Sequence, residues 1–384
     1  MRILIEPLGD QIESDRKLPH TLADELATSG FFKMLVPKDY GGSQITPEDY
    51  FLVLEELARV DGSTAWVVAL LACNSISSGY LPAHVAHDMF AGNQKAGISG
   101  SLAAALREPE EAPNRAVVQD GGYLLSGSWS FASGCMHATT MMALCTLYEE
   151  GKPRLHQEGH PEQRWFYFPK PECRIIENWN TLGLKGTGSH GFEVDNLFIP
   201  EERTLPASTP ISPVHPGLLY SFSSGPAFGH RHIPLAGIST TTLIGVCLGI
   251  ARGAIDAFIE IAGVTRGASS LKSSTRVQEK VGQAEATLRA ARAYQLDTLR
   301  EAWNSVRTHG RQDSEYLKDL TLAGAHTALM AAEAVDLIWS AASITSVFVS
   351  GPFERRFRDI HTATQNGGIT PNIYSMSGRH FLGV

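Results

Sequence analysis

The helical half of this chain is marked most clearly by the stretch VQEKVGQAEATLRAARAYQLDTLREAWNSV, residues 277–306. Apolar residues recur along it at the spacing that places them on one face of an α-helix. No proline interrupts the chain from Leu235 to Gly351, whereas eleven of the 20 prolines lie between Pro153 and Pro234. Because proline is excluded from helix interiors, we expect long helices after residue 235, and such helices usually pack as a bundle.

The rest of the chain divides into a helical part and a β part. Thr46 precedes Pro47 and two acidic residues, which is the pattern of an N-cap followed by a first helical turn. From about residue 95 to residue 200 the chain changes to short runs with strand character, separated by glycine and proline. The expected domains of this α+β chain are an N-terminal helical domain at 1–92, a central β-barrel-like domain at 93–205 and a C-terminal helical bundle at 206–384.

The composition excludes several classes of protein. With 384 residues, 43% of them hydrophobic and 19% charged, the chain is long enough for a large core and close to the globular average. Its 32 basic and 40 acidic residues give a net charge of −8, which does not favour binding to nucleic acid or to an anionic membrane. Five cysteines without CxxC spacing suggest no disulfide framework and no zinc site. The N-terminal apolar run is too short for a signal peptide, so we expect a cytoplasmic protein.

The first segment that could carry chemistry is GYLLSGSWSFASG, residues 122–134. It is a predicted strand followed by an aromatic residue and small hydroxyl residues. An aromatic face can stack on a planar cofactor, and a serine at the end of a strand can form a hydrogen bond with a ring nitrogen. A β-hairpin with a surface serine is the alternative.

Two further segments carry glycines where a backbone could approach a ligand. TLGLKGTGSH, residues 181–190, has the wrong glycine order for a dinucleotide-binding GxGxxG loop and precedes a strand, so we interpret it as a turn near a ligand. GPFERRFRDIHTATQNGG, residues 351–368, is a charged helix that ends in asparagine and two glycines. An ordinary salt-bridged helix is the alternative for this last segment.

Taken in order, five segments resemble the acyl-CoA dehydrogenase fold, and more narrowly its flavin-dependent monooxygenase branch. That branch includes 4-hydroxyphenylacetate hydroxylase oxygenase components, dibenzothiophene monooxygenase and the nitrososynthases. The resemblance implies a helical N-terminal domain, a central β-domain and a C-terminal four-helix bundle, assembled as a homotetramer with flavin sites at subunit boundaries. It rests on residues 32–42, 57–66, 126–134, 182–190 and 358–365.

The same alignment bears on the type of reaction. Dehydrogenases of this family need a carboxylate to remove the proton α to the thioester. Their glutamate position falls on Gly367, and no acidic residue lies between Glu202 and Asp256, where other relatives carry the base. The resemblance therefore implies an oxygenase that uses reduced flavin and O2, through a flavin peroxide, on a small cyclic or aromatic substrate, including a CoA thioester or an amine. An acyl-CoA dehydrogenase-like or oxidase-like flavoenzyme with a displaced base and a non-catalytic paralogue remain as alternatives.

The resemblance also assigns flavin contacts. Ser133, two residues after Phe131, matches the position beside flavin N5, and Phe131 is expected to pack against the ring system. Ser99 and Ser101 fall on the strand that lines the pyrimidine side. Arg266 falls where the family reaches a flavin phosphate from a neighbouring subunit, with a solvated basic helix face as its alternative.

Two motifs that this sequence lacks bear on the type of flavin and on the source of its electrons. The family's glycine-rich loop for the adenine half of FAD is replaced by SITSVF, residues 343–348, which favours FMN over FAD. No dinucleotide fingerprint is visible, so a separate NAD(P)H-flavin reductase is expected to supply the reduced flavin.

The candidate catalytic residues are Ser133, His361 and Asn366. Many hydroxylases of the branch end the Arg-Asp helix with Gln-His, whereas this chain has Gln365-Asn366. Asparagine forms hydrogen bonds but does not titrate. Either His361 takes over a role, or the substrate needs no deprotonation by the enzyme and His361 is an exposed helix residue.

Three other histidines lie in segments that could carry a function. His137 occupies a position that is often histidine in the branch, and a packed core histidine is its alternative. His230 and His232 have no third ligand with fitting spacing, so no metal is expected. They lie in residues 204–234, a long segment without predicted secondary structure that we interpret as a lid over a substrate pocket.

Overall fold

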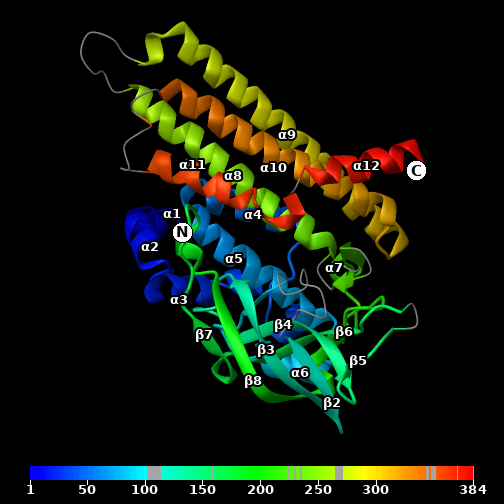
Figure 1. Ribbon diagram of the computed structural model, residues 1–384. Helices are drawn as coiled ribbons and strands as arrows, with labels where there is room; N and C mark the ends of the chain where they lie inside the picture. Colours follow the sequence, from blue (N-terminus) through cyan, green and yellow to red (C-terminus); the bar gives the residue numbers. More distant parts are fainter. Residues whose placement is uncertain are drawn as a thin grey trace.

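The computed structural model arranges the chain as N-terminal helices, a sheet and a long helical bundle (Figure 1). The fold class expected from the sequence is therefore confirmed. The residues that the structure describes are 1–101, 114–156, 159–223, 225–228, 231–233, 236–263, 271–342, 346, 352–369 and 371–383.

The N-terminal helices begin where the sequence signals predicted. Thr46 caps α4 by accepting a hydrogen bond from the Asp49 backbone N–H at 3.1 Å. Asp61 likewise caps α5 through the Thr64 N–H at 2.7 Å. The helices of this part are α1 (Arg2–Ile5), α2 (Gly9–Asp15), α3 (His20–Thr28), α4 (Pro47–Val60), α5 (Gly62–Ser75) and α6 (Ala83–Phe90).

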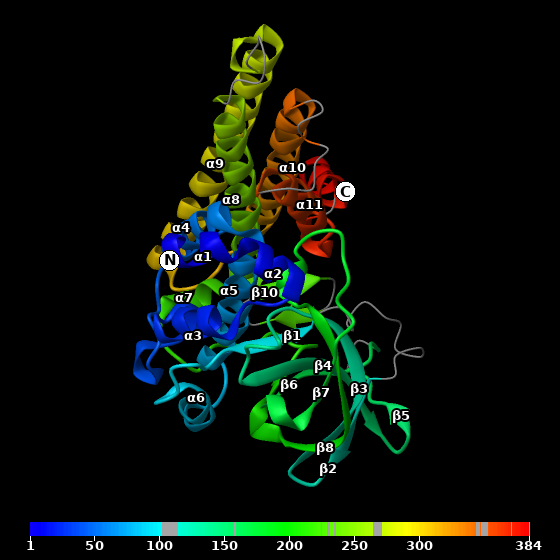
Figure 2. The ribbon, with the colours of Figure 1, turned by 90° about the vertical axis from the view of Figure 1, so that its left-hand side faces the viewer.

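The sheet lies on the far side of α5 from the bundle, and α6 lies beside it (Figures 1 and 2). Its main path follows the order β7-β8-β3-β2-β4-β6-β9, and β1 joins it by pairing in parallel with β4. The strands are β1 (Ile98–Ser101), β2 (Arg115–Gln119), β3 (Gly122–Ala132), β4 (Thr140–Glu149), β5 (Lys152–Pro153), β6 (Gln163–Pro169), β7 (Arg174–Ile176), β8 (His190–Pro200) and β9 (Thr204–Pro206).

The proline-free stretch forms three long helices, as predicted. Helix α8 is long and apolar enough by composition to cross a membrane, but 78% of its most apolar window is buried inside the protein, as in a core helix. The helices of this part are α7 (Leu218–Ser223), α8 (Ala236–Gly263), α9 (Thr275–His309), α10 (Ser314–Ala342), α11 (Pro352–Ala363) and α12 (Asn372–Leu382).

The prediction that residues 204–234 lack secondary structure was wrong. They include β9, α7 and an antiparallel pair formed by β10 (Gly225–Phe228) and β11 (Arg231–Ile233). Tyr220 of α7 is buried, and its hydroxyl donates to the Leu35 carbonyl at 3.1 Å. A long segment packed on the protein must pair its backbone polar groups, and the short strands and helix do so.

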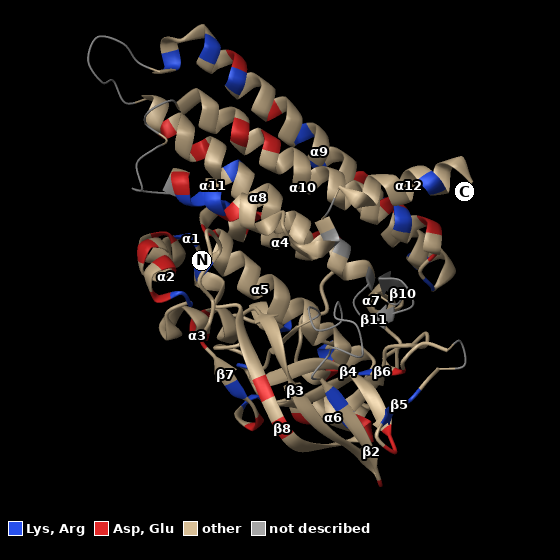
Figure 3. Cartoon of the chain, in the orientation of Figure 1, with Lys and Arg blue, Asp and Glu red and all other residues tan. Residues whose placement is uncertain are grey.

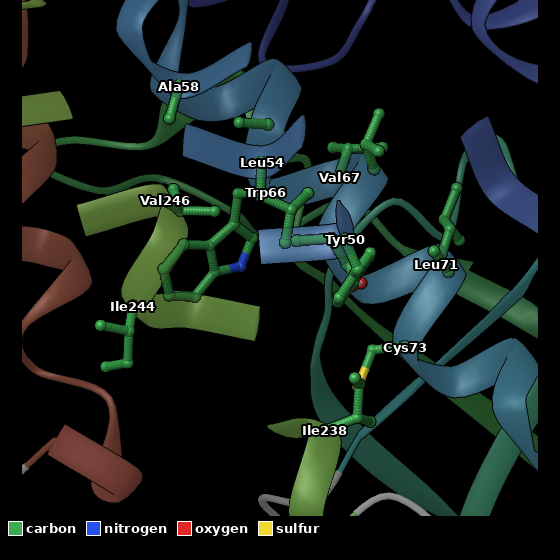
Figure 4. Packing of buried hydrophobic residues seen from close by; sticks show 14 of the residues in the cluster. Tyr50, Leu54, Ala58, Trp66, Val67, Leu71, Cys73, Ile238, Ile244 and Val246 are labelled. Carbon is green, nitrogen blue, oxygen red and sulfur yellow. Dashed lines mark hydrogen bonds between the residues drawn. The ribbon is translucent and has the colours of Figure 1, made fainter. Parts of the chain in front are cut away.

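The bundle and the N-terminal helices share one core. Figure 4 shows Trp66 of α5 in this core with Leu54 of α4 and with Ile244 and Val246 of α8. All four side chains are buried. The position of α5 between the bundle and the sheet is therefore fixed by apolar packing, which is the dominant favourable contribution to folding.

Salt bridges fasten α11 to the N-terminal helices. Basic residues gather at the start of α11 (Figure 3). Arg355 and Arg358 both bind Glu13 of α2, at 2.8 and 2.5 Å, and Arg358 also binds Glu354 at 2.7 Å. Since these charges are paired, this basic cluster is a structural contact between two parts of the chain.

Candidate active site

The end of strand β3 departs from regular pairing. β3 pairs with β8 through Trp129 and Phe192, and the register shifts between Trp129 and Ala132. Within this irregularity Phe131 has a φ of +66°, a left-handed conformation that is unusual for a bulky residue and often marks a functional site. Its side chain is 58% exposed, whereas Trp129 and Phe192 are buried. The irregularity therefore turns one aromatic side chain outward.

Ser133 follows this irregularity and is buried. The indole Nε1 of Trp66 donates to Ser133 Oγ at 3.2 Å, and Ser189 Oγ lies 2.6 Å from the same oxygen. Ser189 Oγ lies 2.7 Å from Thr187 Oγ1, which donates to the Leu184 carbonyl at 2.8 Å. An indole and three hydroxyl groups thus form a continuous chain of hydrogen bonds inside the protein.

The two serines of β1 hold the backbone beside Phe131. Side chains alternate along a strand, so Ser99 and Ser101 share one side of β1. Ser99 Oγ donates to the Ser133 carbonyl at 2.8 Å, and Ser101 Oγ donates to the Ser130 carbonyl. The structure therefore brings four of the residues selected from the sequence together at the end of β3.

The peptide of Leu184 connects this region to the C-terminal helices. Leu184 is buried and has a φ of +50°. Its carbonyl accepts from Trp179 Nε1 at 3.1 Å, and its N–H donates to Asp359 Oδ1 of α11 at 2.6 Å. Trp179 meets Phe131 edge to face, with ring centroids 5.9 Å apart. One residue thus supports both the hydroxyl chain and the aromatic pair of exposed Phe131 and half-buried Trp179.

Sequence reasoning gave no role to several of these contacts. Segments 57–66 and 182–190 were recognised as motifs, but nothing local indicated that they meet at Ser133. The hydrogen bond between Trp66 and Ser133 joins residues 67 positions apart in the chain. The residues that were missed are Trp66, Trp179, Thr187 and Ser189.

Asp359 is a buried carboxylate that contacts this network through the Leu184 N–H. Burial, opposed by the hydrogen bond from Leu184 and aided by the charge of Asp61, raises its pKa to about 7. A narrow recess beside it, too small to hold a water molecule, is lined by Asp61, Ser63, Lys185 and residues of α2 and α11. It has no room for a small molecule, and its lining does not include Ser133 or Phe131.

His361 and Asn366 lie on and after α11. His361 Nε2 is 2.9 Å from Asp336 Oδ1 of α10, and its ring meets Phe357 at a centroid distance of 4.5 Å. Asn366 follows the end of α11, and its carbonyl accepts from the Ile369 N–H at 2.9 Å. Within the described residues, neither His361 nor Asn366 is a hydrogen-bond partner of Ser133.

His137 is a buried histidine. Burial, together with the nearby His20 and Lys170, lowers its pKa to about 4. Its Nε2 has no hydrogen-bond partner among the residues that the structure describes. With this lowered pKa the imidazole is neutral at pH 7. It therefore forms no ion pair at that pH.

Some sequence predictions fall outside the described residues. These are Arg266, His230 and most of segment 343–348. The backbone of His232 belongs to β11, but its side chain is not described. In the described part of the chain, no group of three or more His, Cys, Asp or Glu side chains could hold a metal ion.

Comparison with known proteins gives consistent matches. Residues 2–81 match the N-terminal domain of acyl-CoA dehydrogenase, and residues 242–370 match its C-terminal domain. Indole-3-acetate monooxygenase of Acinetobacter baumannii is 25% identical, over 93% of this chain and 85% of that protein. The oxygenase subunit HsaA of a flavin-dependent monooxygenase from Rhodococcus jostii is 25% identical, over 98% and 94%. The crystal structure of 3-HSA hydroxylase from Rhodococcus sp. RHA1 superposes with a TM-score of 0.85, covers 100% of this chain and 95% of that one, and is 23% identical.

Proposed function

Because the chain belongs to the acyl-CoA dehydrogenase family, with both its N- and C-terminal domains, we propose that it is the oxygenase component of a two-component flavin-dependent monooxygenase. Reduced flavin and O2 are its cosubstrates. Relatives of similar length are named as the oxygenase subunit of a flavin-dependent monooxygenase or as the oxygenase component of a hydroxylase. The single observation that carries the proposal is the pairing of exposed Phe131 with the buried hydroxyl of Ser133 at the end of β3.

The side chains at this point suit a flavin. Phe131 offers an exposed aromatic face. Its backbone has a left-handed conformation, which costs free energy and persists only where the surrounding structure imposes it. Ser133 offers a hydroxyl within a fixed set of hydrogen bonds. A ring system with an apolar face and a polar edge matches such an arrangement of aromatic and hydroxyl groups.

The local chemistry favours oxygenation over dehydrogenation. The described contacts of Ser133 and Phe131 are hydroxyl, indole and backbone groups. The nearby carboxylate of Asp359 is buried and accepts the Leu184 N–H, so it is not placed to remove a proton from a substrate beside Phe131. Dehydrogenation of a thioester needs a free base beside the α-carbon.

A bound reduced flavin would supply the two electrons with which O2 is divided between the oxygenated substrate and water. Phe131 would pack against the flavin ring, and Ser133 would form a hydrogen bond to it. Ser99 and Ser101 keep the Ser130 to Ser133 backbone in place. Burial of the hydroxyl chain excludes water from this side, which strengthens each hydrogen bond.

Further details belong to the same proposal. The substrate is a small aromatic or related cyclic molecule, the class that the name of the indole-3-acetate relative indicates. The enzyme uses FMN in preference to FAD, and a separate NAD(P)H-flavin reductase supplies the reduced flavin. The enzyme is a cytoplasmic homotetramer. Arg266 binds the flavin phosphate, and His361 and Asn366 line the side where oxygen is transferred.

The proposal is tested by loading the protein anaerobically with reduced FMN, or with reduced FAD, and mixing it with oxygen. We expect a delay before oxidised-flavin absorbance returns, and we expect a substrate such as indole-3-acetate to acquire ¹⁸O from ¹⁸O2. Anaerobic reduction of bound oxidised flavin by an acyl-CoA would establish the dehydrogenase alternative. Failure to bind either flavin would indicate a non-catalytic paralogue.

A further inference from the structure

The hydrogen-bond chain behind Ser133 runs between two ends of fixed polarity. An indole N–H can only donate, and a backbone carbonyl can only accept. Trp66 stands at the first end, and the Leu184 carbonyl stands at the other. Between them lie the hydroxyls of Ser133, Ser189 and Thr187, with oxygen separations of 2.6 and 2.7 Å.

These ends determine the direction of every proton in the chain. Four contacts join the five groups, and four protons are available, one from the indole and one from each hydroxyl. The Thr187 hydroxyl donates its hydrogen bond to the Leu184 carbonyl. Ser189 must therefore donate a hydrogen bond to Thr187, and Ser133 must donate one to Ser189. Every hydroxyl donates once and accepts once. All three are at least 95% buried, so bulk water does not compete for these protons.

This direction decides what Ser133 offers to a ligand. Its proton points inward to Ser189, and one lone pair of its oxygen receives the Trp66 N–H. The remaining capacity of the oxygen is to accept one more hydrogen bond. For Ser133 to donate a hydrogen bond to a ligand, Ser189 would have to donate to Ser133 and Thr187 to Ser189. Thr187 would then lose its hydrogen bond to the Leu184 carbonyl.

We propose that Ser189 and Thr187 are positioning residues that make Ser133 a hydrogen-bond acceptor and thereby select reduced over oxidised flavin. The inference rests on the proposed function, because it needs a flavin beside Ser133. Reduced flavin carries a hydrogen on N5, whereas oxidised flavin offers only a lone pair there. An oxygenase that receives reduced flavin and releases the oxidised form gains from this preference.

The test compares the affinities of oxidised and reduced FMN, measured anaerobically at equilibrium, in the wild type and in two variants. Ser189→Ala removes the acceptor for the Ser133 proton. Thr187→Val keeps the shape but frees the Ser189 proton to turn toward Ser133. Each variant is expected to reduce the preference for reduced FMN by about tenfold, the effect of one hydrogen bond. For a two-electron couple this is a shift of about 30 mV in the midpoint potential of bound flavin.

Two control variants distinguish a change in hydrogen-bond direction from a general disruption of the loop. Thr181→Val removes a hydroxyl of the same loop whose one hydrogen bond within the described residues goes to the Gly183 carbonyl, at 2.9 Å, and is expected to keep the wild-type preference. Thr187→Ser retains the hydroxyl and is expected to restore it. An unchanged preference in Ser189→Ala and Thr187→Val, or an equal loss of affinity for both flavin forms, overturns the inference alone. A wild type that binds neither form overturns the proposed function and this inference with it.

Discussion

The backbone N–H of Leu184 donates a 2.6 Å hydrogen bond to Asp359 Oδ1, across 175 positions of sequence. This bond joins helix α11 to the loop that supports Ser133 and Phe131. Leu184 has a left-handed backbone, a conformation that costs about 1–2 kcal/mol for a residue with a side chain. Asp359 therefore stabilises Leu184 in a backbone conformation that is unfavourable for a leucine.

Removing this acceptor is expected to loosen the loop. In Asp359→Ala the Leu184 N–H is buried without a partner, which costs about 1–3 kcal/mol of unfolding free energy. Asp359→Asn keeps an acceptor oxygen and serves as the matched control. Hydrogen exchange followed by mass spectrometry should show faster exchange in residues 182–190 of the alanine variant only. Equal protection in both variants would show that Asp359 does not hold the loop.

The raised pKa of Asp359 makes stability depend on pH. With a folded-state pKa of about 7, against 3.8 for an ordinary aspartate, the folded protein keeps a proton that the unfolded chain releases. The contribution of Asp359 is therefore largest below pH 4 and is lost as the pH rises to 7, by at most about 1.4 kcal/mol per pH unit. Relative to the wild type, Asp359→Asn should gain stability between pH 4.5 and pH 7 in urea titrations. A constant difference between the two proteins would contradict the assignment.

Glu13 is expected to contribute in the opposite direction. Burial tends to raise its pKa, but hydrogen bonds from Arg358 and Arg355 outweigh burial and lower the pKa to about 2. Its contribution is present above pH 4.5 and is lost as the pH falls toward 2. Glu13→Gln should lower the unfolding free energy at pH 7 by about 1–3 kcal/mol.

A matched control for Glu13 is Glu6→Gln. Glu6 forms an exposed pair with Arg2, with both side chains 62% exposed. Such surface pairs contribute at most about 1 kcal/mol. If the two glutamine variants were equally stable at pH 7, the network around Glu13 would have no special role in holding α11.

Phe131 should affect flavin binding without affecting stability. Its ring is 58% exposed, so Phe131→Ala removes little buried surface and should change the melting temperature by less than about 2 °C. Loss of an aromatic contact worth about 1 kcal/mol or more should weaken flavin affinity at least about fivefold. Phe198→Ala is the control, because Phe198 is 46% exposed on β8 and pairs with Leu124, away from Ser133. Similar flavin affinities in the two variants would place the flavin elsewhere.

Local signals in the sequence predicted much of the fold. Proline placement separated the bundle from the central part, and the Thr46 cap located the start of α4, because these features act within a few residues. The family resemblance extended this to the whole architecture and to the residues at the end of β3. Residues 204–234 escaped prediction because the pairing of β10 with β11 has no strong local pattern.

Two kinds of information therefore determine this protein. Local patterns predicted the helices and the order of the helical and β parts, and the composition shows that no acidic residue lies between Glu202 and Asp256. The hydrogen-bond chain through Trp66, Ser133, Ser189 and Leu184 became visible only in the folded protein. These groups lie far apart in the sequence, because they come from a helix, a strand end and a loop. Their separations of 2.6 to 3.2 Å exist only after the core between α5 and the sheet has formed.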